Sequence, residues 1–210
     1  EASLEEPKPT ETDVAKVFDK LYDGKFKCAD GKDGWYEFRE HRWREVDGGV
    51  SLRKLFATDL VDEYSEFKAN LLRNHSDIDS RMDRLDKTSD EFVGLKMDAE
   101  MLLQKIKKCR AVITKLKEVS FHDKLMKALL LTNYDEKFYA KLNENTNILV
   151  CENGVIDLEL GAFRAGLPDD YATFTTGIDF VEFKEDDSEM VELRNYLEKV
   201  YPNPNIRKYF

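Results

Sequence analysis

A tight turn between two β-prone runs limits the possible folds of this chain more than any other feature. Ile148 to Cys151 is an apolar run, Asn153-Gly154 follows it, and Val155 to Leu158 is a second run. An Asn-Gly pair between two such runs is the strongest short-range signal of a β-hairpin, because both central residues of the turn take positive φ. The sequence therefore predicts a hairpin whose turn is formed by Asn153-Gly154.

The residues after this hairpin predict a third strand. Gly161 permits another reversal of the chain, because glycine tolerates positive φ. Phe163-Arg164 can then extend until Gly166 and Pro168 end the strand. We interpret Asp157 and Arg164 as an ion pair that fixes the hairpin rather than as catalytic residues.

The N-terminal part predicts a helix followed by a small sheet. Thr10 or Thr12 can cap the helix, and Gly24 ends it. Its apolar residues have helical spacing: Val14, Val17, Phe18, Leu21 and Tyr22. Three short strands follow, with a turn over 30–34 between the first two: Phe26 to Ala29, Trp35 to Arg39, and Arg42 to Val46.

From Val50 to about Leu142 the pattern is helical. One apolar stripe runs to about Arg73, where the polar residues Asn74 to Asp77 are expected to break the helix. Thr88 to Asp90 can cap the next helix. Asp77 and Asp79 would share a face in a strand and could then hold Mg²⁺, but their polar flanks favour a capping role.

The last part of the chain predicts one more strand and one more helix. Ala172 to Phe183 has a strand-like composition, and Asp186-Asp187-Ser188 can cap a helix that Pro202 stops. The apolar positions of that helix are Met190, Leu193, Leu197 and Val200. The expected fold is α+β and mostly helical, with a small N-terminal antiparallel sheet and a second sheet after the helical segment.

Charge and cysteine usage restrict the possible functions. The net charge is −10, and basic residues supply most of the affinity of proteins for nucleic acid, so DNA binding requires that they gather on one face. Cys28, Cys109 and Cys151 are widely spaced and no histidine lies near them at metal-ligand spacing, which favours free thiols in a reducing compartment. No apolar run is long enough to span a bilayer, and the sequence contains no phosphate-binding G-x-x-x-x-G-K-[ST] loop.

Two groups of residues are candidates for contact with nucleic acid. The first interleaves aromatic rings with arginines and could form a stacking surface for single strands, or a small sheet whose rings face the core: Trp35, Tyr36, Arg39, Arg42, Trp43 and Arg44. The second has no acid between Met101 and Lys117, and could be a solvated helix face or a rim that follows phosphates: Lys105, Lys107, Lys108, Arg110, Lys115 and Lys117.

The ordered residues around the hairpin resemble a known family. They are Leu142-Asn143-x-Asn145, then Asn153-Gly154-Val155-x-Asp157-Leu158, then Phe163-Arg164-x-Gly166-x-Pro168-x-Asp170-Tyr171, and the block Trp35 to Trp43 shares the likeness. Together they resemble the region upstream of the ATPase in superfamily-three primase–helicases of poxviruses and other nucleocytoplasmic large DNA viruses. The likeness covers about residues 12–210 and is weakest over 74–115.

The resemblance implies a non-catalytic collar between a primase-like domain and a ring-shaped, ATP-driven helicase. It implies no cofactor here, ATP and Mg²⁺ for the longer protein, and a cytoplasmic viral replication site in the infected cell. The implied partners are further copies in a ring, other replication proteins, and DNA bound weakly or only by the assembled ring; no membrane is implied. The alternatives are a free-standing single-strand-binding module and a helical protein-interaction scaffold.

In this interpretation the chain has five segments. They are an acidic linker (1–11), a helix with a three-stranded sheet (12–49), a helical segment (50–145), the hairpin segment (146–183) and a helix that leads toward an ATPase domain (184–210). The chain does not begin with Met, so we expect it to be part of a longer protein.

Overall fold

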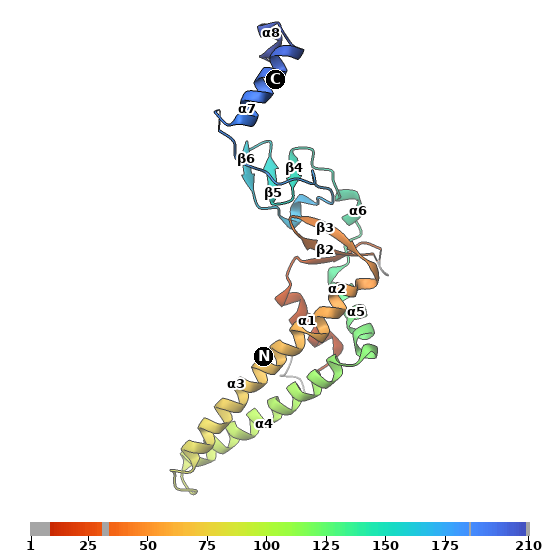
Figure 1. Ribbon diagram of the computed structural model, residues 1–210. Helices are drawn as coiled ribbons and strands as arrows, with labels where there is room; N and C mark the ends of the chain where they lie inside the picture. Colours follow the sequence, from red (N-terminus) through yellow and green to blue (C-terminus); the bar gives the residue numbers. More distant parts are fainter. Residues whose placement is uncertain (1–8, 31–33, 185, 209–210) are drawn as a thin grey trace.

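The computed structural model describes residues 9–30, 34–184 and 186–208, and it confirms the predicted α+β class. A long helical hairpin projects at one end, two small sheets lie in the middle, and two C-terminal helices lie at the other end (Figure 1). Both sheets are antiparallel, with strand orders β1-β2-β3 and β4-β5-β6. Most of the predicted linker (residues 1–8) and residues 31–33 of the predicted turn lie outside the described residues.

The N-terminal helix begins where its capping residue predicts. Thr10 caps α1 (Glu11–Leu21): its Oγ1 accepts from Asp13 N at 3.4 Å, and Asp13 Oδ2 accepts from Thr10 N at 3.0 Å. Such reciprocal bonds satisfy amide groups that have no partner within the helix. The predicted strands follow as β1 (Phe26–Cys28), β2 (Trp35–Arg39) and β3 (Arg42–Val46).

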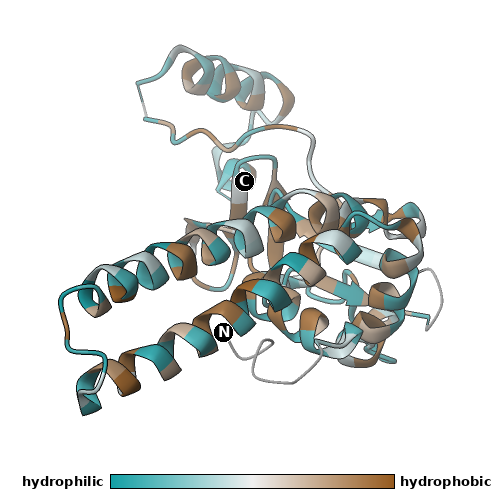
Figure 2. Cartoon of the chain, turned by 90° about the horizontal axis from the view of Figure 1, so that it is seen from below, coloured by the Kyte–Doolittle hydropathy of each residue, from teal (hydrophilic) through white to brown (hydrophobic). Residues whose placement is uncertain are grey.

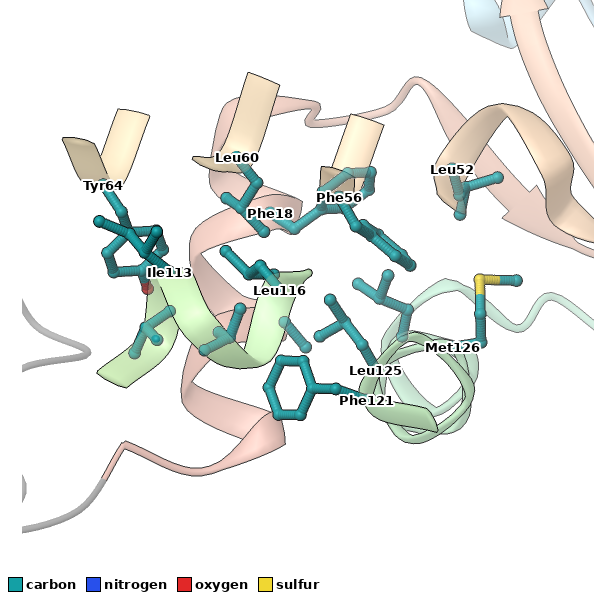
Figure 3. Close-up of a cluster of buried hydrophobic side chains, with 14 of the residues drawn as sticks. Phe18, Leu52, Phe56, Leu60, Tyr64, Ile113, Leu116, Phe121, Leu125 and Met126 are labelled. Carbon is teal, nitrogen blue, oxygen red and sulfur yellow. The ribbon is translucent and has the colours of Figure 1, made fainter. Parts of the chain in front are cut away.

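The main hydrophobic core forms where the helices meet the first sheet. A 3-10 turn (Asp47–Gly49) leads into α2 (Val50–Ala57) and α3 (Asp59–Met82); α4 (Asp90–Leu116) and α5 (Val119–Asn133) follow. Figure 3 shows side chains from α1 to α5 filling this core. Ser89 caps α4 as predicted, its Oγ accepting from Phe92 N at 3.2 Å.

Two predictions for the helical segment were wrong. The helix does not break at Asn74 to Asp77 but continues to Met82, because packing against α4 stabilises these polar residues in helical conformation. The break lies instead at Thr58, between α2 and α3. Asp77 and Asp79 are therefore inside a helix and cap nothing. In a helix, residues two apart do not face each other, and Asp79 pairs instead with His75 at 2.9 Å.

The predicted hairpin is present, but its turn differs. The strands are β4 (Ile148–Cys151), β5 (Gly154–Asp157) and β6 (Ala162–Arg164). Cys151 pairs with Gly154, so the turn is Glu152-Asn153, and neither Asn153 nor Gly154 has positive φ. Gly154 is needed for space: a Cβ atom there would lie 2.8 Å from Arg164 O and 2.5 Å from Phe163 Cζ.

The C-terminal part departs further from prediction. Residues 172–183 form no regular strand, although Thr176 N donates to Val150 O at 2.8 Å and Glu152 N to Ile178 O at 3.0 Å. We call residues 172–183 the strap, because they run along the edge of β4. The predicted helical segment ends with the short α6 (Phe138–Lys141). The predicted C-terminal helix is present as α7 (Ser188–Val200), and the short α8 (Pro204–Arg207) follows it.

Replacing Gly154 by Ala should destabilise the chain by ~1–3 kcal/mol, because the added methyl group collides with the β6 backbone. Gly94 is the matched control: it lies in α4 with open space around its Cβ position, so Gly94→Ala should stabilise the chain by ~0.5–1 kcal/mol. Urea unfolding of both variants measures the difference. Equal effects would contradict the steric role of Gly154.

Candidate functional site

The residues of the family pattern converge at the junction between the two sheets. Arg164, at the end of β6, donates from Nη2 to Asp170 Oδ1 at 2.8 Å and from Nη1 to Asp170 Oδ2 at 2.9 Å. Its Nε donates to Asp157 Oδ2 at 3.1 Å. The guanidinium group thus joins β5, β6 and the turn over Pro168–Asp170, and the predicted Arg164–Asp157 pair is confirmed with Asp170 as a second carboxylate.

These ion pairs shift the pKa values of all three side chains. The hydrogen bonds that Arg164 donates to Asp170, and secondarily to Asp157, raise the pKa of Arg164 above its ordinary value. Burial acts to raise the pKa of Asp170, but hydrogen bonds from Arg164 and from Leu167 N lower it overall. The pKa of Asp157 is lowered by hydrogen bonds from the backbone N–H of Leu160 and from Arg164. All three groups are therefore held in their charged forms.

The turn fixed by Arg164 contacts the first sheet closely. Trp43 Nε1 donates to Pro168 O at 2.8 Å, and Trp43 N donates to Ala172 O at 2.7 Å. Gly166 N donates to His41 Nδ1 at 3.1 Å, and a Cβ atom at Gly166 would lie 2.7 Å from His41 O. Gly166 is therefore needed because two backbone segments meet there.

An aromatic cluster lies beside this contact. The ring of Phe138, from α6, is 5.1 Å from the ring of Trp43 and 5.9 Å from that of Tyr171. Tyr171 has φ 48°, and its carbonyl oxygen accepts from Asn143 N at 2.9 Å. Edge-on aromatic contacts of this kind add stability beyond the apolar area that they bury. Tyr171 therefore joins the end of the hairpin segment to the first sheet.

The remaining family residues hold the strap on the second sheet. Asn153 Nδ2 donates to Phe180 O at 2.9 Å and its Oδ1 accepts from Phe180 N at 2.8 Å. The ring of Phe163 stacks on that of Phe180, with 4.5 Å between centroids. The hairpin-pattern residues described above thus each have a structural contact.

Sequence reasoning missed several residues of this junction. Glu152 accepts from Arg42 Nη1 at 3.1 Å and from Thr175 Oγ1 at 2.5 Å, so it connects three segments. His41, with φ 65°, and Phe180 are the others. His41 lies in the two-residue turn between β2 and β3, and so short a turn indicates an unusual backbone conformation. Its partner, Gly166, is 125 positions away, and the sequence around His41 gives no sign of that contact.

The aromatic–arginine block divides between the core and ion pairs. Trp35, Tyr36 and Trp43 are 1%, 8% and 2% exposed, so of the two predicted arrangements the structure has the one in which the rings face the core: none presents a face to a base. Two of its arginines are paired, Arg42 with Glu152 and Arg44 with Glu40. Arg39 lies exposed at the end of β2.

The basic residues of α4 surround its buried face, as predicted. Lys105, Lys108 and Lys115 are half-buried; Lys115 Nζ donates to Pro9 O at 3.5 Å and lies 5.4 Å from the centre of the Phe121 ring. Lys107 and Arg110 are exposed on α4, and Lys117 is exposed just after it. These three basic side chains are therefore open to solvent near the C-terminal end of α4.

The described part of the chain groups no three His, Cys, Asp or Glu side chains in a way that could hold a metal ion. Among the same residues, no helix is long and apolar enough to cross a membrane.

Comparison with known proteins places this architecture among viral proteins. Residues 15–202 match the family described as D5 N terminal like. The chain is 33% identical to "Putative helicase L207/L206" of Acanthamoeba polyphaga mimivirus over 93% of its own length and 19% of that protein's. It is 30% identical to "Putative helicase 121R" of Invertebrate iridescent virus 3 over 96% of its length and 22% of that protein's. The chain thus spans about a fifth of the length of these relatives.

Asp170→Asn should destabilise the chain by about 2 kcal/mol at pH 7, because it leaves part of the Arg164 guanidinium without its buried charged partner. The folded-state pKa of Asp170 is lowered below the unfolded value of about 3.9. The ion pair therefore contributes fully above about pH 5, and its contribution is lost as the pH falls through the folded pKa. The difference from the unmodified chain should shrink below about pH 4.

Unfolding by urea at several pH values between 3 and 7 measures this difference. The matched control is Asp169→Asn at the exposed neighbouring position, which should change stability little at any pH. A loss for Asp170→Asn that stays the same across the whole range would show that the charge of Asp170 is not what stabilises the junction.

Proposed function

Because this chain belongs to the D5 N terminal like family, we propose that it is a collar that supports ring assembly and DNA handling in a viral replication primase–helicase. The predicted resemblance is confirmed at the level of a helicase-associated N-terminal domain of large DNA viruses. Under the proposal the chain holds its neighbours in position and breaks no bonds itself. The observation that carries it is the use of every hairpin-pattern residue in a structural contact between sheets, turn and strap.

The chemistry belongs to other parts of the longer protein in this proposal. ATP and Mg²⁺ would bind to a motor domain of the superfamily-three type and power unwinding, and a primase-like domain would make primers. The length of the relatives, about five times that of the matched region, leaves room for both. The setting would be a cytoplasmic viral replication site, which the three buried free cysteines suit.

DNA would contact the chain through the exposed basic residues at the C-terminal end of the long hairpin. Lys107, Arg110 and Lys117 are the candidates, because they are exposed and lie in a stretch without acids. With a net charge of −10, one copy should bind DNA weakly. Several copies in a ring would place several such sites around one DNA strand, which raises the effective concentration of basic side chains.

The purified chain should show no nucleotide hydrolysis above a buffer control. Release of phosphate from ATP, measured with and without single-stranded DNA, tests this. The chain with Arg164→Lys serves as a junction control and should behave the same way. Turnover by the chain itself would contradict the collar role, because chemistry would then occur where we propose only a mechanical function.

Replacing Arg110 and Lys117 together by Gln should weaken binding to single-stranded DNA and lower the slope of log affinity against log salt by about 1–2. The matched control makes the same charge change on another helix, with Lys16→Gln and Lys20→Gln on the exposed face of α1. Fluorescence anisotropy at roughly 20–200 mM salt measures both. Over this range the Debye length falls from about 20 Å to about 7 Å, so exposed charges are screened progressively. Equal losses for the two double variants would show that only net charge matters.

A further inference from the structure

Helix α7 has an apolar stripe, none of whose residues is fully buried in the described chain. Met190, Leu193, Leu197 and Val200 recur at helical spacing, yet α7 has no buried residue. An isolated helix of 13 residues is marginally stable in water, because too few hydrogen bonds form per nucleated turn. Helices of this length are stabilised by packing of their apolar face, so a partner for this stripe is required.

Helix α4 has a second apolar stripe that is equally without a partner. Val93, Met97 and Met101 follow one another at four-residue intervals and are 52%, 62% and 58% exposed. They lie on the side of α4 opposite Leu95, Ala99 and Ile106, which are buried. Figure 2 shows α3 and α4 side by side, with hydrophobic residues distributed around both helices. Methionine adapts readily to the shape of a partner, which suits a docking surface.

The charges beside the two stripes are opposite in sign. On α4 the apolar stripe is followed by Lys107 and Lys108, with no acid from Met101 to Lys117. On α7 the apolar stripe is preceded by the acids Asp186 and Glu189. If the two helices pack antiparallel, Val200 lies beside Val93, Leu197 beside Met97 and Leu193 beside Met101. The same register places Glu189, in the first turn of α7, about 3 Å along the helix axis from Lys107, because both helices rise 1.5 Å per residue.

We propose that α7 of one copy of this chain docks antiparallel on the outer face of α4 of a second copy. Within one copy the contact is excluded by position, because α7 and the long hairpin lie at opposite ends of the molecule with both sheets between them (Figure 1). The surface that one copy contributes, on α7, differs from the surface that it contacts on the other copy, on α4. Such head-to-tail contacts form rings when the rotation between copies closes.

This contact deepens the proposed assembly role and rests on it. It also separates two sets of basic residues. Lys107 lies nearer the outer stripe and would be covered, whereas Arg110 lies farther around α4 from the stripe and would stay open to DNA. The two functions therefore do not compete for the same side chains.

Disulfide trapping tests the contact in the whole chain. Met97→Cys and Leu197→Cys are made in separate preparations, mixed and oxidised; the three native cysteines are buried and do not interfere. We expect a covalent product of twice the 24.5 kDa chain mass in the mixture. The control pairs Met97→Cys with Leu160→Cys, a more exposed site in the turn between β5 and β6, and should give about tenfold less product.

An exchange of charges provides a second, independent measurement. Lys107→Glu and Glu189→Lys should each weaken self-association roughly two- to fivefold in sedimentation experiments, the usual range for one exposed ion pair. Mixing the two variants should restore association at the interface where the charges are again opposite. Neither variant changes a buried residue, so both should fold.

The outcomes distinguish this contact from the wider assembly role. Self-association without preferential trapping of the Met97–Leu197 pair, or without rescue by charge exchange, overturns the α4–α7 contact and leaves the assembly role standing. A chain that stays monomeric at all concentrations and forms no trapped product overturns both. Trapping with rescue supports both.

Discussion

The bidentate pair between Arg164 and Asp170 is the interaction on which the middle of the structure depends. It fixes the turn that begins at Pro168, and that turn presents the Pro168 carbonyl to Trp43. The second carboxylate, Asp157, ties the same guanidinium to β5. A lysine could supply the charge but not the planar fork that reaches two carboxylates at once. The position of the second sheet on the first therefore follows from one side chain.

Elements defined by local chemistry could be predicted from the sequence. The cap at Thr10, the strands β2 and β3 and the stripe of α4 all depend on residues within a few positions of each other. The errors arose where distant contacts decide. The polar turn Asn74 to Asp77 stays helical because α4 pairs with it, and the turn of the hairpin moves to Glu152-Asn153 so that Gly154 can fit beneath Phe163.

The candidate site shows the same division. The pattern around the hairpin was recognisable, and its Arg164–Asp157 pair followed from the residue types. The alternation of Trp35, Tyr36 and Trp43 with arginines predicted either a stacking surface or rings in the core, and it could not decide between them. Alternation assigns rings to two faces without saying whether both are covered. In this chain the helical core covers Trp35, and Phe138 covers Tyr36 and Trp43. The strap was mispredicted because the side chain of Asn153 pairs with its backbone in place of a neighbouring strand.

A rigid junction has a consequence for the two ends of the molecule. At Gly166 and His41 the backbones are so close that even a methyl group would separate them, so the angle between the sheets has little freedom. The long hairpin joins one side of this junction through the main core, and α7 joins the other side through the strap. The Arg164 turn therefore lies on the path between the strap and the main core. Its Arg164, Asp157 and Asp170 side chains are all occupied with one another, which holds this part of the path in one arrangement.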